Sequence, residues 1–167
     1  MSQRLHVSAV LPGTHASLTE WRNTIGTLVR TGDPRDTYYK VYTRYIRSEV
    51  LGDRHSIPDL YEALAGRPVI EPGERRRMME ITEGDDPVRR AIIGGDVYVG
   101  VVGDDGEWDG DVRVSTAAEA AEALETLERL AREPRAARWS EQVRRQVGDY
   151  IAFYRTLQPG EEVVYSW

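Results

Sequence analysis

Residues 140–167 read SEQVRRQVGDYIAFYRTLQPGEEVVYSW, and this stretch predicts a helix followed by a strand. Ser140 is a typical helix N-cap, and Pro159-Gly160 is a typical stop. Between them apolar residues recur at helical spacing; they are Val143, Val147, Tyr150, Ile151, Tyr154 and Leu157. Residues 162–167, rich in Val and Tyr, are typical of a short terminal strand.

The segment before this helix predicts a second long helix. Thr116 and Glu119 form a capping-box pattern, in which each side chain bonds the backbone N–H of the other residue. Pro134 ends the helix, since proline cannot continue one. One face is apolar, with Ala120, Leu124, Leu127 and Ala131.

Further strands are predicted at residues 4–11 and 96–102, and residues 111–115 return as the second arm of a hairpin whose turn is 103–110. Strands at both chain ends and a hairpin in the middle predict a small sheet covered by helices. We therefore expect a helix-rich α+β fold. A chain of 167 residues fits one domain, which we place over residues 1–167.

Five more helices are predicted from caps and periodicity. Ser17 and Glu20 form a capping box ahead of a helix over residues 18–30. Asp33-Pro34 opens a helix that Gly52 ends, with an apolar stripe of Tyr38, Val41, Tyr42, Tyr45, Ile46 and Val50. The others cover residues 58–65, 73–82 and 88–93.

Three stretches of the C-terminal half carry a family resemblance: DPVRRAIIGG at 86–95, STAAEAAEALETL at 115–127, and YIAFY at 150–154 with the strand EVVY at 162–165. They resemble the YfbM-like family of domains of unknown function. Residues 58–66 look like a divergent form of the family's earlier helix, without its usual Trp and His. The resemblance implies an α+β fold of this length. It implies no activity and transfers no functional residue.

The amino-acid composition and the missing motifs exclude several kinds of catalytic and metal site. The chain has no cysteine, which excludes disulfides, thiolate metal sites and thiol nucleophiles. Its three histidines lack metal-ligand spacing, so we expect no metal, and no phosphate-binding loop or serine elbow is present. We therefore expect no cofactor, and these absences favour a non-catalytic role while leaving an enzyme open as the alternative. No apolar run is long enough for a membrane helix, and no signal-peptide core is present. We expect a cytoplasmic protein with no membrane partner.

The net charge of −6 disfavours nucleic acid, because phosphate contacts need clustered cations. It favours a basic protein partner. The densest acidic cluster surrounds a tryptophan, and exposed aromatics often anchor partners. We predict the partner site there, at Asp104, Asp105, Glu107, Trp108 and Asp109. The predicted function is a non-catalytic protein-binding module; in its specific form, it is an immunity-type protein that neutralises a basic toxin or effector.

A second hypothesis is a binder of small anionic ligands, or an enzyme acting on one. Its pocket would lie between the tyrosine-rich helix and the arginine run at 75–77, with Tyr38, Tyr42, Arg44 and Arg75 as lining residues. A deep cavity would favour this hypothesis, whereas a flat acidic face would favour protein binding. The sequence leaves the oligomeric state, the partner and any substrate open.

Overall fold

A computed structural model describes residues 4–20, 45–67, 73, 86–95, 97–102 and 108–167, with the backbone alone at 98–102 and 108–111. Its strands form a five-stranded sheet in the order β2-β1-β5-β4-β3. All neighbouring pairs are antiparallel. The strands are β1 Arg4–Val10, β2 Tyr45–Asp53, β3 Val97–Val102, β4 Trp108–Ser115 and β5 Glu162–Ser166.

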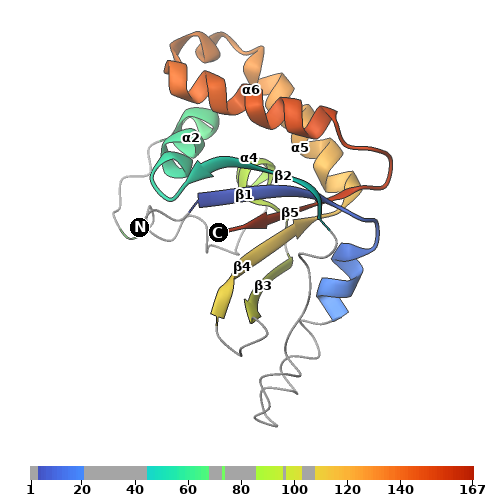
Figure 1. The fold of residues 1–167 in the computed structure, drawn as a ribbon. Helices are drawn as coiled ribbons and strands as arrows, with labels where there is room; N and C mark the ends of the chain where they lie inside the picture. Colours follow the sequence, from blue (N-terminus) through green and yellow to red (C-terminus); the bar gives the residue numbers. More distant parts are fainter. Residues whose placement is uncertain (1–3, 21–44, 68–72, 74–85, 96, 103–107) are drawn as a thin grey trace.

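Helices cover one face of the sheet (Figure 1). They are α2 Ser56–Ala65, α4 Pro87–Ile93, α5 Ala117–Ala131 and α6 Glu141–Arg155, and the 3-10 helix η3 Pro134–Arg138 joins α5 to α6. On the opposite face lies a helical segment, residues 14–20. The α+β fold is therefore as the sequence predicts, with the strands from the chain ends adjacent and β3–β4 as the hairpin. Among the described residues, no helix is long and apolar enough to cross a membrane.

The two sheet faces carry separate apolar clusters because side chains alternate along a strand. In β5, Val163 and Tyr165 join the large core under the helices, while Val164 joins a smaller cluster on the other face. Leu18, from the segment 14–20, packs in that smaller cluster. The sheet is thus buried on both faces at its centre, which accounts for the continuous Val and Tyr run of β5.

Three buried tyrosines connect α6 to α4 and to β5 through hydrogen bonds. Tyr150 donates a hydrogen bond to the carbonyl of Ile92 at 2.6 Å, and Tyr154 donates to the carbonyl of Ala91 at 2.6 Å. The hydroxyls of Tyr154 and Tyr165 lie 2.5 Å apart. Because Tyr154 gives its one proton to a carbonyl, Tyr165 is the donor between the two rings. Burial raises the pKa of Tyr165 to about 12.

Caps and periodicity predicted the C-terminal elements well. Thr116 and Glu119 form the predicted capping box of α5, with backbone-to-side-chain distances of 3.1 Å in both directions. Ser140 caps α6 by accepting from the backbone N–H of Val143. The predicted helices 58–65 and 88–93 are confirmed as α2 and α4, and the strands 4–11, 96–102 and 162–167 as β1, β3 and β5.

The predicted helix from Asp33 to Gly52 is wrong over its second half, because residues 45–53 form the strand β2. Tyr45, Ile46 and Val50 coincide with helical spacing, yet aromatic and β-branched residues also favour strands. Pairing with β1 decided the outcome, since it gives β1 a hydrogen-bonded neighbour on each side. Residues 33–44 and 74–82 lie outside the described residues, as does most of the predicted helix 18–30.

Two predicted boundaries also need correction. Ser17 is not an N-cap: its backbone N–H bonds the carbonyl of Gly13 inside a helix that begins at residue 14. Residues 108–110 belong to β4 and not to a turn. They pair with β3, with Gly110 opposite Val101 and Trp108 opposite Val102. A register irregularity separates these two pairs, and such a bulge hides the alternation that marks a strand.

Candidate functional site

The described surface is hollowed on both sides of η3, where α5 turns into α6 beside the end of α2. Trp139, the residue that follows η3, lines both hollows. We call the two hollows and Trp139 the Trp139 surface. It is assembled from α5, η3 and α6, which follow one another along the chain, and from α2, which comes much earlier in the sequence.

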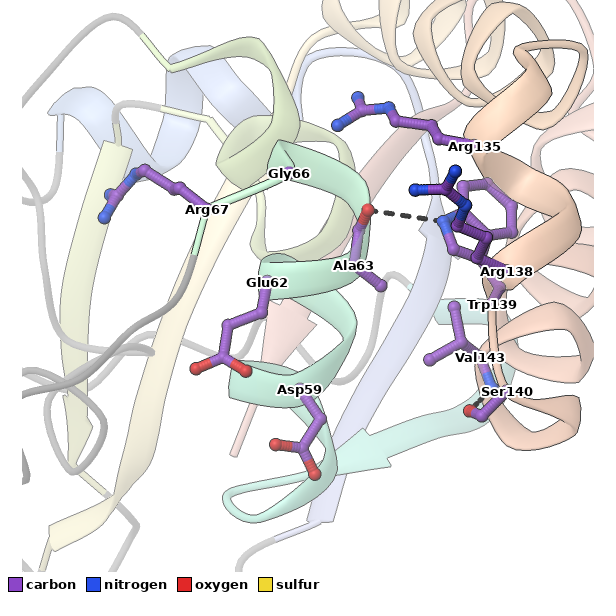
Figure 2. A pocket seen from close by; sticks show the side chains of 10 residues that line it. All are labelled: Asp59, Glu62, Ala63, Gly66, Arg67, Arg135, Arg138, Trp139, Ser140 and Val143. Carbon is purple, nitrogen blue, oxygen red and sulfur yellow. Dashed lines mark hydrogen bonds between the residues drawn. The ribbon is translucent and has the colours of Figure 1, made fainter.

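The first hollow, about 620 Å³, lies between α2 and the start of α6. Figure 2 shows α2 on one side, with Asp59 and Glu62, and the η3–α6 connection on the other, with Arg138 and Trp139. The acidic side chains thus come from α2, whereas the basic ones come both from the η3–α6 connection and from Arg67, just past the end of α2. The complete lining is Asp59, Glu62, Ala63, Gly66, Arg67, Arg135, Arg138, Trp139, Ser140 and Val143.

The second hollow, about 500 Å³, lies on the other side of η3 and is mostly apolar. Its α6 wall carries Arg144, Val147, Gly148 and Ile151, which are spaced as one face of a helix. The rest of its lining comes from the end of α5 and from η3: Ala131, Glu133, Pro134, Ala136, Ala137 and Trp139.

The η3 segment caps the C-terminus of α2, whose last carbonyls have no partner within their own helix. The indole Nε1 of Trp139 donates to the carbonyl of Ala63 at 3.3 Å, a bond drawn in Figure 2. Arg135 donates to the carbonyl of Leu64 at 2.7 Å, and its Nε pairs with Glu133 at 2.8 Å. These bonds fix Trp139 in place while leaving it only half-buried.

Gly66 ends α2 in the left-handed region, with φ of 70°. A Cβ atom built there would lie 2.0 Å from Nη1 of Arg135. The left-handed backbone conformation favours glycine at this position, and any side chain there would also displace the guanidinium of Arg135. Arg135 is thus a structural cation, held against the helix end that it caps.

Arg138 is different: it is exposed, and it makes no hydrogen bond or ion pair within the described parts of the chain. Arg144 is exposed as well, and it donates to the carbonyl of Ala137 at 2.7 Å. Residues 129–145 contain six arginines and two glutamates, a balance of +4 in a chain whose net charge is −6. The Trp139 surface therefore lies in a basic stretch of an otherwise acidic protein.

At the outer end of the first hollow, Arg67 stacks on Tyr61, its guanidinium carbon 5.0 Å from the ring centroid. Arg67 also donates to the Tyr61 hydroxyl at 2.9 Å, and that hydroxyl donates to Asp86, the N-cap of α4. Burial, followed by the bond to Asp86, raises the pKa of Tyr61 above its usual value. Tyr61 is therefore neutral at physiological pH and connects α2 to α4.

The structure describes only part of the predicted acidic binding site. Asp104, Asp105 and Glu107 lie outside the described residues, and Trp108 and Asp109 open β4, where only the backbone is described. The alternative pocket residues Tyr38, Tyr42, Arg44 and Arg75 also lie outside the described residues. Both predicted sites stay predictions.

Sequence reasoning missed the Trp139 surface because Pro134 was interpreted only as the end of a helix. The available signal was the run PRAARWS at 134–140, in which arginines and a tryptophan fill a helix-to-helix connection. Aromatic residues and arginine are the types enriched in binding hot spots. In the described portion of the chain, no group of three or more His, Asp or Glu side chains could hold a metal ion.

The fold places this chain among α+β proteins. It has a five-stranded antiparallel sheet with helices α2, α4, α5 and α6 on one face. A solved structure of that class is described as a protein of unknown function, YfbM from Escherichia coli. It superposes with a TM-score of 0.50 over 98% of this chain and 99% of its own, at 17% identity. The chain thus has a YfbM-like fold. No protein-family model and no curated protein matches it significantly.

Proposed function

We propose that this protein is a non-catalytic protein-binding module whose binding face includes the Trp139 surface, and that it is a divergent member of the YfbM-like family. The observation that carries the proposal is the placement of Trp139 between two hollows. A half-buried tryptophan offers a large contact area and loses little conformational freedom on binding.

The environment of Trp139 supports this proposal. Its bond to Ala63 holds the indole before any partner arrives, and such pre-organisation lowers the cost of association. Arg138, next to it in sequence, is exposed and available for a charged contact. The hollows on either side can accept side chains of a partner.

The specific form of the proposal is an immunity-type protein that neutralises a basic toxin or effector. It rests on the acidic residues at 104–109, which are separate in sequence from the basic Trp139 surface. Charge reversal at Asp104, Asp105 and Asp109 should abolish protection from such a toxin. If this variant still protects fully, the protein is not an immunity-type protein that acts through these acidic residues. The proposal of a protein-binding module is tested separately.

Site-specific photo-crosslinking tests the module proposal. A photoreactive amino acid replaces Ala137, which is exposed beside Trp139, and the protein is irradiated in a lysate of its source cells. We expect a discrete adduct that the additional change Trp139→Ala strongly reduces. The matched control carries the same group at Ser48, which is exposed on β2.

An adduct of equal yield at Ala137 and Ser48, or one that Trp139→Ala leaves unchanged, would show nonspecific contact. Either result would reject the Trp139 surface as a binding face. Circular dichroism of the Trp139→Ala variant shows whether it remains folded, and Trp139→Phe serves in its place if it does not.

A further inference from the structure

Gly148 occupies a costly position. It lies inside α6, is exposed, and a Cβ built on it meets no atom within 4 Å. Glycine in a helix interior destabilises a protein relative to alanine, because it loses more conformational freedom on folding. Its φ does not lie in the left-handed region, in contrast to that of Gly66. Neither packing nor backbone conformation therefore requires glycine at this position.

Gly148 is also one of the residues that line the second hollow. It lies on the α6 wall between Arg144 and Ile151, and alanines 131, 136 and 137 from α5 and η3 line the same hollow. Any larger side chain would project from that wall. The hollow, at about 500 Å³, is within the usual size range of ligand pockets.

The charges around this hollow define the occupant. Arg144 lines it, and its bond to the carbonyl of Ala137 keeps the guanidinium at the rim. Arg138 is exposed as well and lines the neighbouring first hollow, which shares Trp139 with the second. Glu133 lines the hollow too, but it is paired with Arg135. An apolar hollow with Arg144 in its lining and Arg138 in the adjoining hollow is complementary to an apolar side chain flanked by carboxylates.

We propose that the second hollow receives an apolar side chain from an acidic peptide segment of the partner, and that Gly148 keeps the space for it. Arg138 and Arg144 pair with the carboxylates of that segment, and Trp139 packs against its apolar part. This inference rests on the module proposal, not on its immunity form, and assigns the chemistry of the partner segment that the Trp139 surface binds. Nucleic acid fits less well, since the lining is apolar and the chain as a whole is acidic.

Selection from a displayed library of short random peptides provides the probe. We expect enrichment of sequences in which Leu, Ile or Phe is flanked by Asp or Glu. The best synthetic peptide should bind about tenfold or more weakly to an Arg138→Glu/Arg144→Glu variant, a change of about 1.4 kcal/mol. Its affinity should fall with added salt, because exposed charges are screened.

The variants Gly148→Ala and Gly148→Leu test the hollow directly. Gly148→Ala should raise the melting temperature and weaken peptide binding, a combination that a purely structural glycine would not give. Gly148→Leu should abolish binding. The matched control is Ala121→Leu, on an exposed part of α5 that lines neither hollow.

Three results would overturn the inference: no enriched peptide, enriched peptides without acidic residues, or binding unchanged by Gly148→Leu. Displacement of the peptide by a single-stranded oligonucleotide at equal concentration would assign the site to nucleic acid instead. If crosslinking at Ala137 captures a partner while no acidic peptide binds, the module proposal stands and the acidic-peptide inference falls.

Discussion

The indole of Trp139 donates its only hydrogen bond to the carbonyl of Ala63, so the residue that exposes an aromatic edge to solvent also caps α2. One side chain thus links the candidate binding face to the stability of a helix. Substitutions of Trp139 must therefore distinguish its role in binding from its role in capping α2.

Trp139→Phe is such a change. It keeps an aromatic ring but removes the Nε1 donor, which leaves the Ala63 carbonyl to solvent. We expect the free energy of unfolding to fall by about 1 kcal/mol, the usual net value of a hydrogen bond, with the fold retained. Urea denaturation measures this. A loss near zero would show that the bond contributes nothing to α2.

Removing one hydroxyl from the tyrosine group should have a larger effect. Tyr154→Phe deprives the buried Tyr165 hydroxyl of its acceptor and the Ala91 carbonyl of its donor. We expect a loss of about 1–3 kcal/mol in unfolding free energy, because an unsatisfied buried polar group is costly. Double-mutant analysis with Tyr165→Phe should show coupling, since the second change removes the stranded hydroxyl. Strict additivity would contradict an energetically significant hydrogen bond between the two hydroxyls.

The same group predicts how stability depends on alkaline pH. Burial raises the pKa of Tyr165 to about 12 and the pKa values of Tyr150 and Tyr154 well above 10. In the unfolded chain these hydroxyls ionise near pH 10, whereas in the folded protein they keep their protons. The stability contribution is therefore complete below pH 10 and is lost as the pH rises toward 12.

Chemical denaturation across that pH range would reveal the loss as a falling unfolding free energy. Tyr165→Phe removes one titrating group and should flatten the slope between pH 10 and 12. A slope that does not change would mean that Tyr165 titrates alike in both states.

Two glycines at helix positions should respond to alanine with opposite signs. Gly66→Ala places a side chain in the left-handed region and against Arg135, so we expect a loss of more than about 1 kcal/mol. Gly148→Ala should gain about 0.5–1 kcal/mol, since nothing opposes the added methyl group. Thermal unfolding of the two variants side by side provides the comparison.

The sequence predicted those elements whose local signals agree with their tertiary context. The α5 capping box and the periodic face of α6 each have short-range causes, and both are confirmed. β2 was missed because its stripe of Tyr45, Ile46 and Val50 satisfies a helical template, and only pairing with β1, some forty residues earlier in the chain, favours the strand. The local sequence of such a stretch does not show whether a distant strand will pair with it.

The candidate site was harder to predict than the fold. A hollow depends on which side chains of α2, η3 and α6 come together, and nothing in the sequence of any one element records that packing. The positive charge of residues 129–145 could be counted, yet its importance depends on Gly148 and Trp139 bordering the same space. Local chemistry can be predicted from the sequence, but the meeting of distant elements cannot.

β5 lies at the middle of the sheet, between β1 and β4, although it follows every other described strand along the chain. During translation, the β1–β2 and β3–β4 pairs emerge from the ribosome before the strand that joins them exists. Their inner edges stay open to other chains until residue 166 has left the exit tunnel. Closure of the sheet therefore waits for β5, and loss of this strand would expose the inner edges of β1 and β4, which would then be prone to aggregate.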